Sequence, residues 1–275
     1  WQKVWMDFGL SDDEVRGYFT GPAHLPWHRM GNIDHWDGPL PQSYIDHQRE
    51  LQKRILARER ELGMTPVLPG FAGHVPAALK RLHPEAKTTH LNQRCWGGFT
   101  PRYATHFLDP EDPLFGAIQK AFLEEQTRQF GTDHVYGVDP FNEMVPPSWE
   151  PQYLRRVSRA IYESLASVDP EAVWLQMSWL FYHRQDKWTA DCIKALVTGA
   201  PPGKMLLLDY YCDNVELWRR TSSFHGQPYL WCYLGNFGGN TVLAGDFRTT
   251  DRRLTDVMSD PAAGHLSGVG STLEG

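Results

Sequence analysis

Six short apolar runs, separated by helical patterns, most constrain what this chain can fold into. Each run is apolar almost throughout rather than at alternate positions, which is typical of strands covered on both faces in a parallel sheet. The runs are residues 64–68, 134–138, 173–179, 205–208, 229–234 and 266–269. Alternation of such runs with helices predicts parallel strand–helix–strand units and an α/β fold.

The helical patterns around these runs carry clear start signals. Asp112 stands before Pro113, and an acidic cap followed by a proline in the first turn is typical of a helix start. Ser11 is followed three residues later by Glu14, which has the form of a capping box. We expect helices over residues 1–6, 43–62, 113–130, 151–167 and 190–197.

Strands that alternate with helices fit either a barrel or a doubly wound sheet, and the glycine loops discriminate between them. Residues 235–239 do not match the G-x-G-x-x-G loop of a dinucleotide fold, and the sequence has no G-x-x-x-x-G-K-[ST] phosphate loop. The length of 275 residues is close to the roughly 250 of an α/β barrel. We therefore expect a (β/α)8 TIM-type barrel, incomplete at both ends, with residues 1–275 forming part of one catalytic domain.

Charge and cysteine spacing argue against several classes of function. The net charge is −6 and the basic residues are scattered, which disfavours nucleic acid as a partner. No apolar run reaches the roughly 20 residues needed to span a bilayer. The four cysteines have the spacing of neither a zinc site nor a disulfide scaffold, and Cys232 is most simply a small buried hydrophobe. They are Cys95, Cys192, Cys212 and Cys232.

Two histidines have the spacing of a helical metal pair. His24 and His28 are four residues apart, but Pro26 lies between them and predicts that the required helical face does not form. The sequence also lacks the G-x-S-x-G loop of an α/β serine hydrolase. We therefore expect neither a metal nor a cofactor.

Tryptophan is abundant in this chain, with 11 residues. Aromatic rings provide flat apolar surfaces, and concave ligand sites are commonly lined by them. Residues 20–42 and 83–112 lack any clear periodicity, and each exceeds the roughly 12 to 15 residues usual for featureless loops. We expect both stretches to be functional loops that follow strands, with sugars among their ligands.

Two glutamates follow apolar runs at the ends where barrel enzymes place their chemistry. Glu143 comes after the second run and Glu274 after the sixth. Two carboxylates that flank one sugar suffice for glycosidic bond cleavage without a metal. Asn142 precedes Glu143 and is suited to hold a substituent of the sugar, although a loop-capping asparagine and solvated loop glutamates are the simpler alternatives.

Several runs of this sequence, taken together, resemble one family of enzymes. Residues 20–32, 36–41, 63–76, 136–148, 226–232 and 236–240, with the closing Glu274 and Gly275, are similar to glycoside hydrolase family 89, the α-N-acetylglucosaminidases. The similarity runs in collinear order along the whole chain. It departs at Tyr210, where the human-type enzymes have an aliphatic residue, and at Gly235, where they have a histidine.

The resemblance implies a retaining exo-enzyme that removes terminal α-linked N-acetylglucosamine from a glycan, as in glycosaminoglycan degradation. Glu143 would be the acid/base and Glu274 the nucleophile. The residues that would line the pocket are Trp27, Trp96, Asn142, Trp179, Tyr210, Leu234 and Phe237. Family members are lysosomal, secreted or periplasmic, and they carry a small N-terminal domain and a C-terminal helical domain that this chain does not show. This segment alone is therefore expected to be inactive.

Two other hypotheses remain open from the residues themselves. One is a glycosidase with a different sugar or anomeric specificity. The other is a carbohydrate-binding protein without catalysis, which would need aromatic surfaces but no pair of carboxylates at catalytic separation.

Overall fold

The computed structural model describes residues 1–91, 96–236 and 245–272. The chain divides into two compact units. Unit 1 comprises Trp1–Pro147 and Ala160–Ala172, and unit 2 comprises Ser148–Arg159 and Val173–Gly275. Helix α7 (Pro151–Ala166) contributes residues to both units. Each unit combines parallel strands with helices, which confirms the predicted α/β class.

Unit 1 is built on two parallel strands, β1 (Leu68–Pro69) and β5 (Val135–Gly137), with Leu68 opposite Tyr136. Helix α6 (Pro113–Phe130) has the predicted bounds. Its cap is also as predicted, because the side chain of Asp112 accepts a hydrogen bond from the backbone of Leu114. Gln126 of α6 donates from its buried side-chain amide to the carbonyl of Pro69 at 3.0 Å, which joins the helix to the end of β1.

Three further helices of unit 1 begin close to the expected residues. Helix α1 (Gln2–Asp7) opens the chain, and α2 (Asp12–Tyr18) begins with the predicted capping box. In that box the side chain of Ser11 accepts from the backbone of Glu14, and the Glu14 side chain accepts in return from the backbone of Ser11. The long helix α4 (Gln42–Glu61) buries only Leu56, consistent with its highly charged sequence.

The stretch 83–112 is more regular than we predicted from its sequence. Strand β4 (His106–Leu108) lies between β2 (His74–Val75) and β3 (Thr88–His90) in a small antiparallel sheet. Helix α5 (Leu79–Leu82) and the short turns η2 (Trp96–Gly98) and η3 (Pro101–Tyr103) complete the region. Strands of two or three residues are too short to show a periodic pattern, which is why the sequence did not reveal them.

A short helix forms around Pro26, but it does not contain both histidines. Turn η1 (Pro22–His24) leads directly into helix α3 (Leu25–Arg29), and Pro26 lies in the first turn of α3. A proline is tolerated there because the first backbone N–H groups of a helix have no partner within it. His24 is the N-cap of α3 with non-helical dihedral angles, whereas His28 lies inside α3, so the two histidines do not share one helical face, as predicted.

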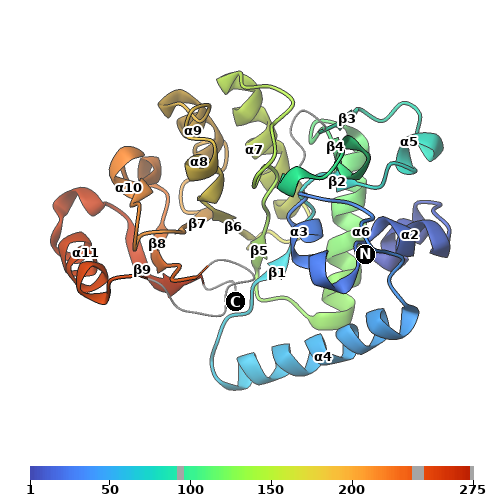
Figure 1. Ribbon diagram of the computed structural model, residues 1–275, viewed down its shortest axis with the longest axis horizontal. Helices are drawn as coiled ribbons and strands as arrows, with labels where there is room; N and C mark the ends of the chain where they lie inside the picture. The colour runs from blue at the N-terminus through green and yellow to red at the C-terminus, as the bar shows by residue number, and fades with distance from the viewer. Residues whose placement is uncertain (92–95, 237–244, 273–275) are drawn as a thin grey trace. The chain divides into compact units, whose positions relative to one another are not determined.

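Unit 2 contains four parallel strands that lie in chain order (Figure 1). They are β6 (Val173–Met177), β7 (Met205–Asp209), β8 (Tyr229–Tyr233) and β9 (Leu266–Ser271). The connections contain α8 (Trp179–His183), α9 (Ala190–Val197), α10 (Leu217–Arg220), η4 (Ser223–Gly226), α11 (Phe247–Ser259) and η5 (Pro261–Ala263). Helix α11 was not predicted, because it is largely polar and buries only Val257.

Large aromatic side chains fill the core of unit 2. Trp174, Trp218 and Trp231 are at most 2% exposed. Among the described residues, Cys192, Cys212 and Cys232 are buried free thiols, which confirms the interpretation of Cys232; Cys95 lies outside the described residues. No helix in the described part of the chain is long and apolar enough to cross a membrane.

Candidate active site

Several of the predicted site residues follow the carboxyl ends of strands. In unit 2, Trp179 begins the helix after β6, Tyr210 directly follows β7 and Leu234 directly follows β8. In unit 1, Asn142 and Glu143 lie in the loop after β5. Because parallel strands bring their carboxyl ends to one edge, these residues lie at the edge of their own unit where barrel enzymes place their sites. Trp27 and Trp96 do not follow a parallel strand; they lie in α3 and η2.

Glu143 is half-buried and is held by a residue that the sequence analysis did not single out. The side-chain amide of Asn32 donates to Oε2 of Glu143 at 3.1 Å. Asn32 is 2% exposed, and its backbone N–H donates to the carbonyl of Trp27 in α3. Its own Oδ1 is buried without a hydrogen-bond partner among the described residues. The only signal in the sequence was its position after Gly31 in the family-like run 20–32.

Asn142, like Asn32, is buried and, among the described residues, uses only the N–H side of its amide for hydrogen bonding. It is 4% exposed, and its side-chain amide donates to Sδ of Met30 at 3.3 Å. Its Oδ1 is also buried and has no hydrogen-bond partner in the described residues. The amide oxygen of Asn142, the residue before Glu143, can therefore still accept a hydrogen bond, and hydroxyl or amide N–H groups of a sugar are suitable donors for it.

The loop that carries Glu143 is supported from β2. The ring of His74 is buried, and its Nε2 donates to the carbonyl of Pro140 at 3.1 Å. Burial lowers the pKa of His74 to about 4, so the ring is neutral near pH 7 and one nitrogen carries the N–H that this bond needs. Gly31 has φ +75°, and a Cβ at this position would lie 2.2 Å from the His74 ring. The close approach of Gly31 and His74 therefore holds the segment around Asn32 against the loop before Glu143.

His28 contributes to the packing of this region through Nδ1. Its Nδ1 lies 3.2 Å from the carbonyl of Ile33 and 3.4 Å from Oδ1 of Asp34, and both His28 and Asp34 are buried. The rings of Tyr18 and Phe19 pack edge-on against the imidazole. Across the described residues, no group of three His, Cys, Asp or Glu side chains could hold a metal ion.

The two tryptophans predicted in unit 1 are in contact. The ring centroids of Trp27 and Trp96 are 5.3 Å apart, and Trp96 stacks on Phe99 with an interplanar angle of 9°. Trp36 packs edge-on against Phe99. These half-buried rings join the two stretches 20–42 and 83–112 into one aromatic cluster, which we define as Trp27, Trp36, Trp96, Phe99 and Tyr103.

In unit 2, Trp179 and Tyr210 pack edge-on with ring centroids 6.1 Å apart. The hydroxyl of Thr272, just after β9, donates to the carbonyl of Tyr210 at 2.9 Å. The side chain of Leu234 is fully buried, and its backbone N–H donates to Asp213. Phe237 and Glu274, the remaining predicted residues, lie outside the described residues.

A buried carboxyl group precedes Tyr210 and was also missed from sequence. Asp209 is fully buried at the end of β7 and accepts hydrogen bonds from the backbone N–H groups of Leu217 and Trp218 at 3.2 and 2.9 Å. Burial raises the pKa of Asp209 to about 7, despite these two donors. Its bonds to the start of α10 indicate that it fixes the loop that contains Tyr210.

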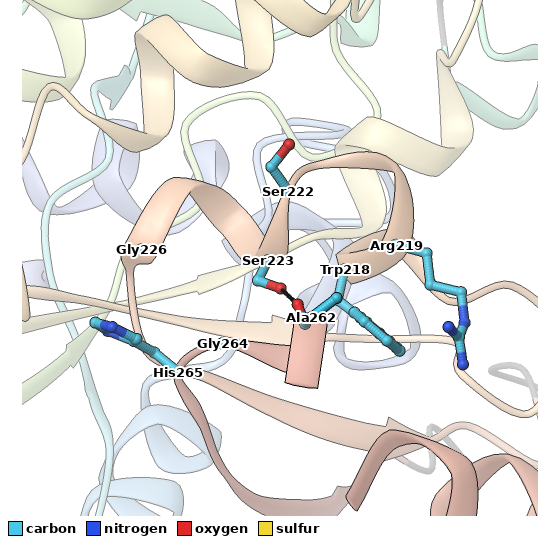
Figure 2. Close-up of a pocket in the computed structure, with 8 residues that line it drawn as sticks. All are labelled: Trp218, Arg219, Ser222, Ser223, Gly226, Ala262, Gly264 and His265. Atoms are coloured by element: carbon cyan, nitrogen blue, oxygen red, sulfur yellow. Dashed lines mark hydrogen bonds between the residues drawn. The ribbon is translucent and has the colours of Figure 1, made fainter. Parts of the chain in front are cut away.

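A depression of about 570 Å³ in unit 2 does not contain the predicted residues (Figure 2). Its lining belongs to the segments that enter β8 and β9, and so it lies at the amino ends of those strands. The lining residues are Trp218, Arg219, Ser222, Ser223, Gly226, Ala262, Gly264 and His265. Ser223 donates from its hydroxyl to the carbonyl of Ala262 across this depression, and Arg219 pairs with Glu216 and Asp260.

Parallel strands joined by helices, with a carboxylate and aromatic rings beyond the strand ends, are typical of α/β-barrel enzymes that act on sugars. A sequence profile of the alpha-N-acetylglucosaminidase (NAGLU) tim-barrel domain matches residues 1–275. The chain belongs to this family, as its sequence motifs predicted, and its fold is of the TIM-barrel type.

Individual relatives agree with this assignment. The chain is 49% identical over 246 residues to human alpha-N-acetylglucosaminidase, an alignment that covers 89% of this chain and 33% of the human protein. A family 89 glycoside hydrolase from Clostridium perfringens in complex with 2-acetamido-1,2-dideoxynojirmycin matches with a TM-score of 0.85 and 26% identity, over 99% of this chain and 30% of that one. The chain therefore spans about a third of the length of these relatives.

A second structure of the Clostridium perfringens enzyme is also similar. It carries two Glu-to-Gln substitutions and holds its substrate, GlcNAc-alpha-1,4-galactose. This structure has a TM-score of 0.85 to the chain and 25% identity, and the match covers 99% of this chain and 30% of that one.

Proposed function

We propose that this protein is a retaining exo-glycoside hydrolase that releases terminal α-linked N-acetylglucosamine. The observation that carries the proposal is Glu143 itself, a half-buried carboxylate oriented by the Asn32 amide in a domain of the NAGLU family. An oriented carboxyl group beside buried amide acceptors is suited to exchange a proton with a glycosidic oxygen.

The proposed mechanism uses two carboxylates in two steps. Glu143 donates a proton to the departing glycosidic oxygen while Glu274 attacks the anomeric carbon and forms a glycosyl–enzyme bond. Glu143 then removes a proton from a water molecule that displaces Glu274, which restores the original anomeric configuration. A retaining mechanism requires carboxyl groups roughly 5 to 5.5 Å apart, and this separation is our expectation for Glu143 and Glu274.

The relatives support both the pair of glutamates and the sugar. The substrate complex of the Clostridium perfringens enzyme was obtained with two glutamates replaced by glutamine. Its substrate carries an α-linked GlcNAc, and the inhibitor of the other complex is a 2-acetamido compound. The buried oxygen of Asn142 is suited to accept a hydrogen bond from the acetamido N–H of such a sugar.

The predicted pocket residues are the basis for proposing that the enzyme cleaves at chain ends (exo specificity). Most of the residues that the family resemblance assigns to the pocket are aromatic or apolar, as expected for a pocket that encloses one terminal sugar. They are Trp27, Trp96, Trp179, Tyr210, Leu234 and Phe237. A blind pocket of this kind admits a chain end and excludes the interior of a polymer.

The complete protein, expressed with all of the sequence that its gene encodes, tests the proposal on 4-nitrophenyl α- and β-N-acetylglucosaminides. We expect release of nitrophenol from the α-anomer only. Turnover of the β-anomer, or of a different nitrophenyl sugar alone, would favour a glycosidase of other specificity. Binding of N-acetylglucosamine without any turnover would favour a carbohydrate-binding protein.

A further inference from the structure

In the hydrogen bond between Asn32 and Glu143, it matters for proton transfer which side chain donates and which accepts. An ionised carboxylate can only accept hydrogen bonds, so the amide N–H of Asn32 donates to Oε2 of Glu143. A proton carried on Oε2 would point toward this N–H and be repelled by it. Protonation of Oε2 is therefore disfavoured. The Asn32 contact therefore favours Oε1 as the oxygen that carries the transferred proton.

Asn32 is itself held rigidly. Its backbone N–H donates to the carbonyl of Trp27, and the preceding Gly31 lies against the His74 ring. His74 donates to the carbonyl of Pro140 in the loop that leads to Glu143. Donor and carboxylate are thus fixed to the same frame, which is the arrangement that keeps a reacting group within a few tenths of an ångström of its productive position.

The unsatisfied end of Asn32 argues that stability is not its main task. The residue is 2% exposed, yet its Oδ1 has no hydrogen-bond partner among the described residues. A buried polar atom without a partner is destabilising, and such atoms are concentrated at functional sites. The unpaired Oδ1 of Asn32 therefore lowers the stability of the fold, while the side-chain N–H of the same residue bonds Glu143, the carboxylate proposed to transfer the proton.

We propose that Asn32 is a positioning residue that orients the carboxyl group of Glu143 and assigns the transferred proton to Oε1. This inference rests on the proposed function, because it concerns the acid/base step of that reaction. Asn32 makes no bond to the substrate in this proposal and acts through Glu143 alone. Its removal therefore affects the protonation of the leaving group and leaves sugar binding largely intact.

The test compares the variant Asn32→Ala with wild type on two substrates with different leaving groups. GlcNAc-α-1,4-galactose has a poor leaving group that needs a proton, whereas 4-nitrophenolate leaves without one. For Asn32→Ala we expect kcat/KM, which reports the first, glycosylation step, to fall about tenfold to hundredfold on the disaccharide and less than about threefold on the nitrophenyl substrate.

Gln126→Ala provides the matched control. Gln126 is another buried amide of unit 1, and it donates to the carbonyl of Pro69 rather than to a carboxylate. Its loss should lower Tm but should leave the ratio of the two kcat/KM values at its wild-type level. The control thereby separates a loss of stability from a loss of orientation.

Asn32→Asp adds a pH profile that a purely structural role would not produce. The new carboxyl group can donate to Glu143 only while it is protonated, so activity on the disaccharide should recover as the pH falls and be lost as it rises. The neighbouring ionisable groups are the same in wild type and variant. They are His28, Asp34 and His74.

The outcomes separate this inference from the proposed function. Equal losses on both substrates in Asn32→Ala, with an unshifted pH profile in Asn32→Asp, would overturn the positioning role while wild-type activity still supports the proposed function. A wild-type protein that hydrolyses neither substrate would overturn both. A selective loss on the disaccharide together with recovery at low pH in Asn32→Asp supports the inference.

Discussion

Gly31 lies so close to the ring of His74 that a Cβ on Gly31 would be 2.2 Å from two of its ring atoms. The contact joins the turn after α3 to strand β2, and it fixes the backbone next to Asn32. It also explains why a residue without a side chain is needed at this position, where φ is +75°.

Gly31→Ala should therefore be strongly destabilising, and Gly63→Ala provides a matched control. Gly63 has nearly the same φ, +74°, but a Cβ there would meet nothing within 4 Å. We expect Gly63→Ala to cost about 1–2 kcal/mol from backbone strain alone, and Gly31→Ala about 1–3 kcal/mol more from overlap with His74. Urea unfolding measures both, and equal costs would show that the His74 contact is unimportant.

His134 and Asp169 provide a pH-dependent contribution to stability. Nδ1 of His134 lies 2.8 Å from Oδ2 of Asp169, and this hydrogen bond raises the pKa of His134 above its usual value. Burial raises the pKa of Asp169, but hydrogen bonds from Tyr136 and His134 outweigh it and the net pKa is lowered. The protonated His134 thus stabilises the folded state below its unfolded pKa of about 6.5, and this contribution is lost as the pH rises through the folded pKa.

His134→Gln should accordingly lower Tm most near pH 5.5 and much less at pH 8. Below about pH 4 the difference should shrink again, because Asp169 becomes protonated. Thermal unfolding of both proteins from pH 3.5 to pH 8.5 measures this difference directly. A Tm difference that does not vary with pH would contradict the assigned role of the pair.

The pocket role of the aromatic cluster predicts different effects for two of its members. Trp96→Ala removes a ring that contacts Trp27. We expect kcat/KM for the nitrophenyl substrate to fall about tenfold to hundredfold, because the variant loses about 1.5–3 kcal/mol of apolar contact with the sugar. Trp36→Ala removes a ring of the same cluster that contacts Phe99 and Tyr103 instead. Equal losses in both variants would indicate that the cluster only supports the loops.

The sequence predicted the larger elements well, because their signals extend over many residues. Helix α6 has the predicted bounds because Asp112 and Pro113 mark its start, and the capping box at Ser11 forms as expected. All six apolar runs contain strands, although β1 is only two residues long and begins at the last residue of its run. Periodicity and capping are local properties, so a single sequence reveals them.

The supporting contacts around the site could not be predicted in the same way. Asn32 and Glu143 are 111 residues apart, and nothing in either local pattern indicates that they meet. The buried pair of His28 and Asp34 and the contact of Gly31 with His74 also depend on tertiary packing. The residue types and family-like motifs indicate the carboxylate and the tryptophans, but no local pattern indicates Asn32 as the residue that orients the carboxylate.

The proposed nucleophile gives a prediction that separates retention from inversion. Glu274→Ala should abolish turnover of every substrate, and azide should restore it by attacking the open face of the anomeric carbon, with a β-glycosyl azide as product. Proton NMR of the wild-type reaction should show the α-anomer of N-acetylglucosamine first. A first-formed β-anomer, or full activity in Glu274→Ala, would contradict the assignment.

The most direct test of the acid/base role of Glu143 is the ratio of kcat/KM for two substrates in Glu143→Gln relative to wild type. The account predicts a loss of about 10²- to 10⁴-fold on GlcNAc-α-1,4-galactose, whose leaving group needs a proton, and a much smaller loss on the 4-nitrophenyl glycoside. Equal losses on the two substrates, or an active Glu143→Gln on the disaccharide, would contradict it.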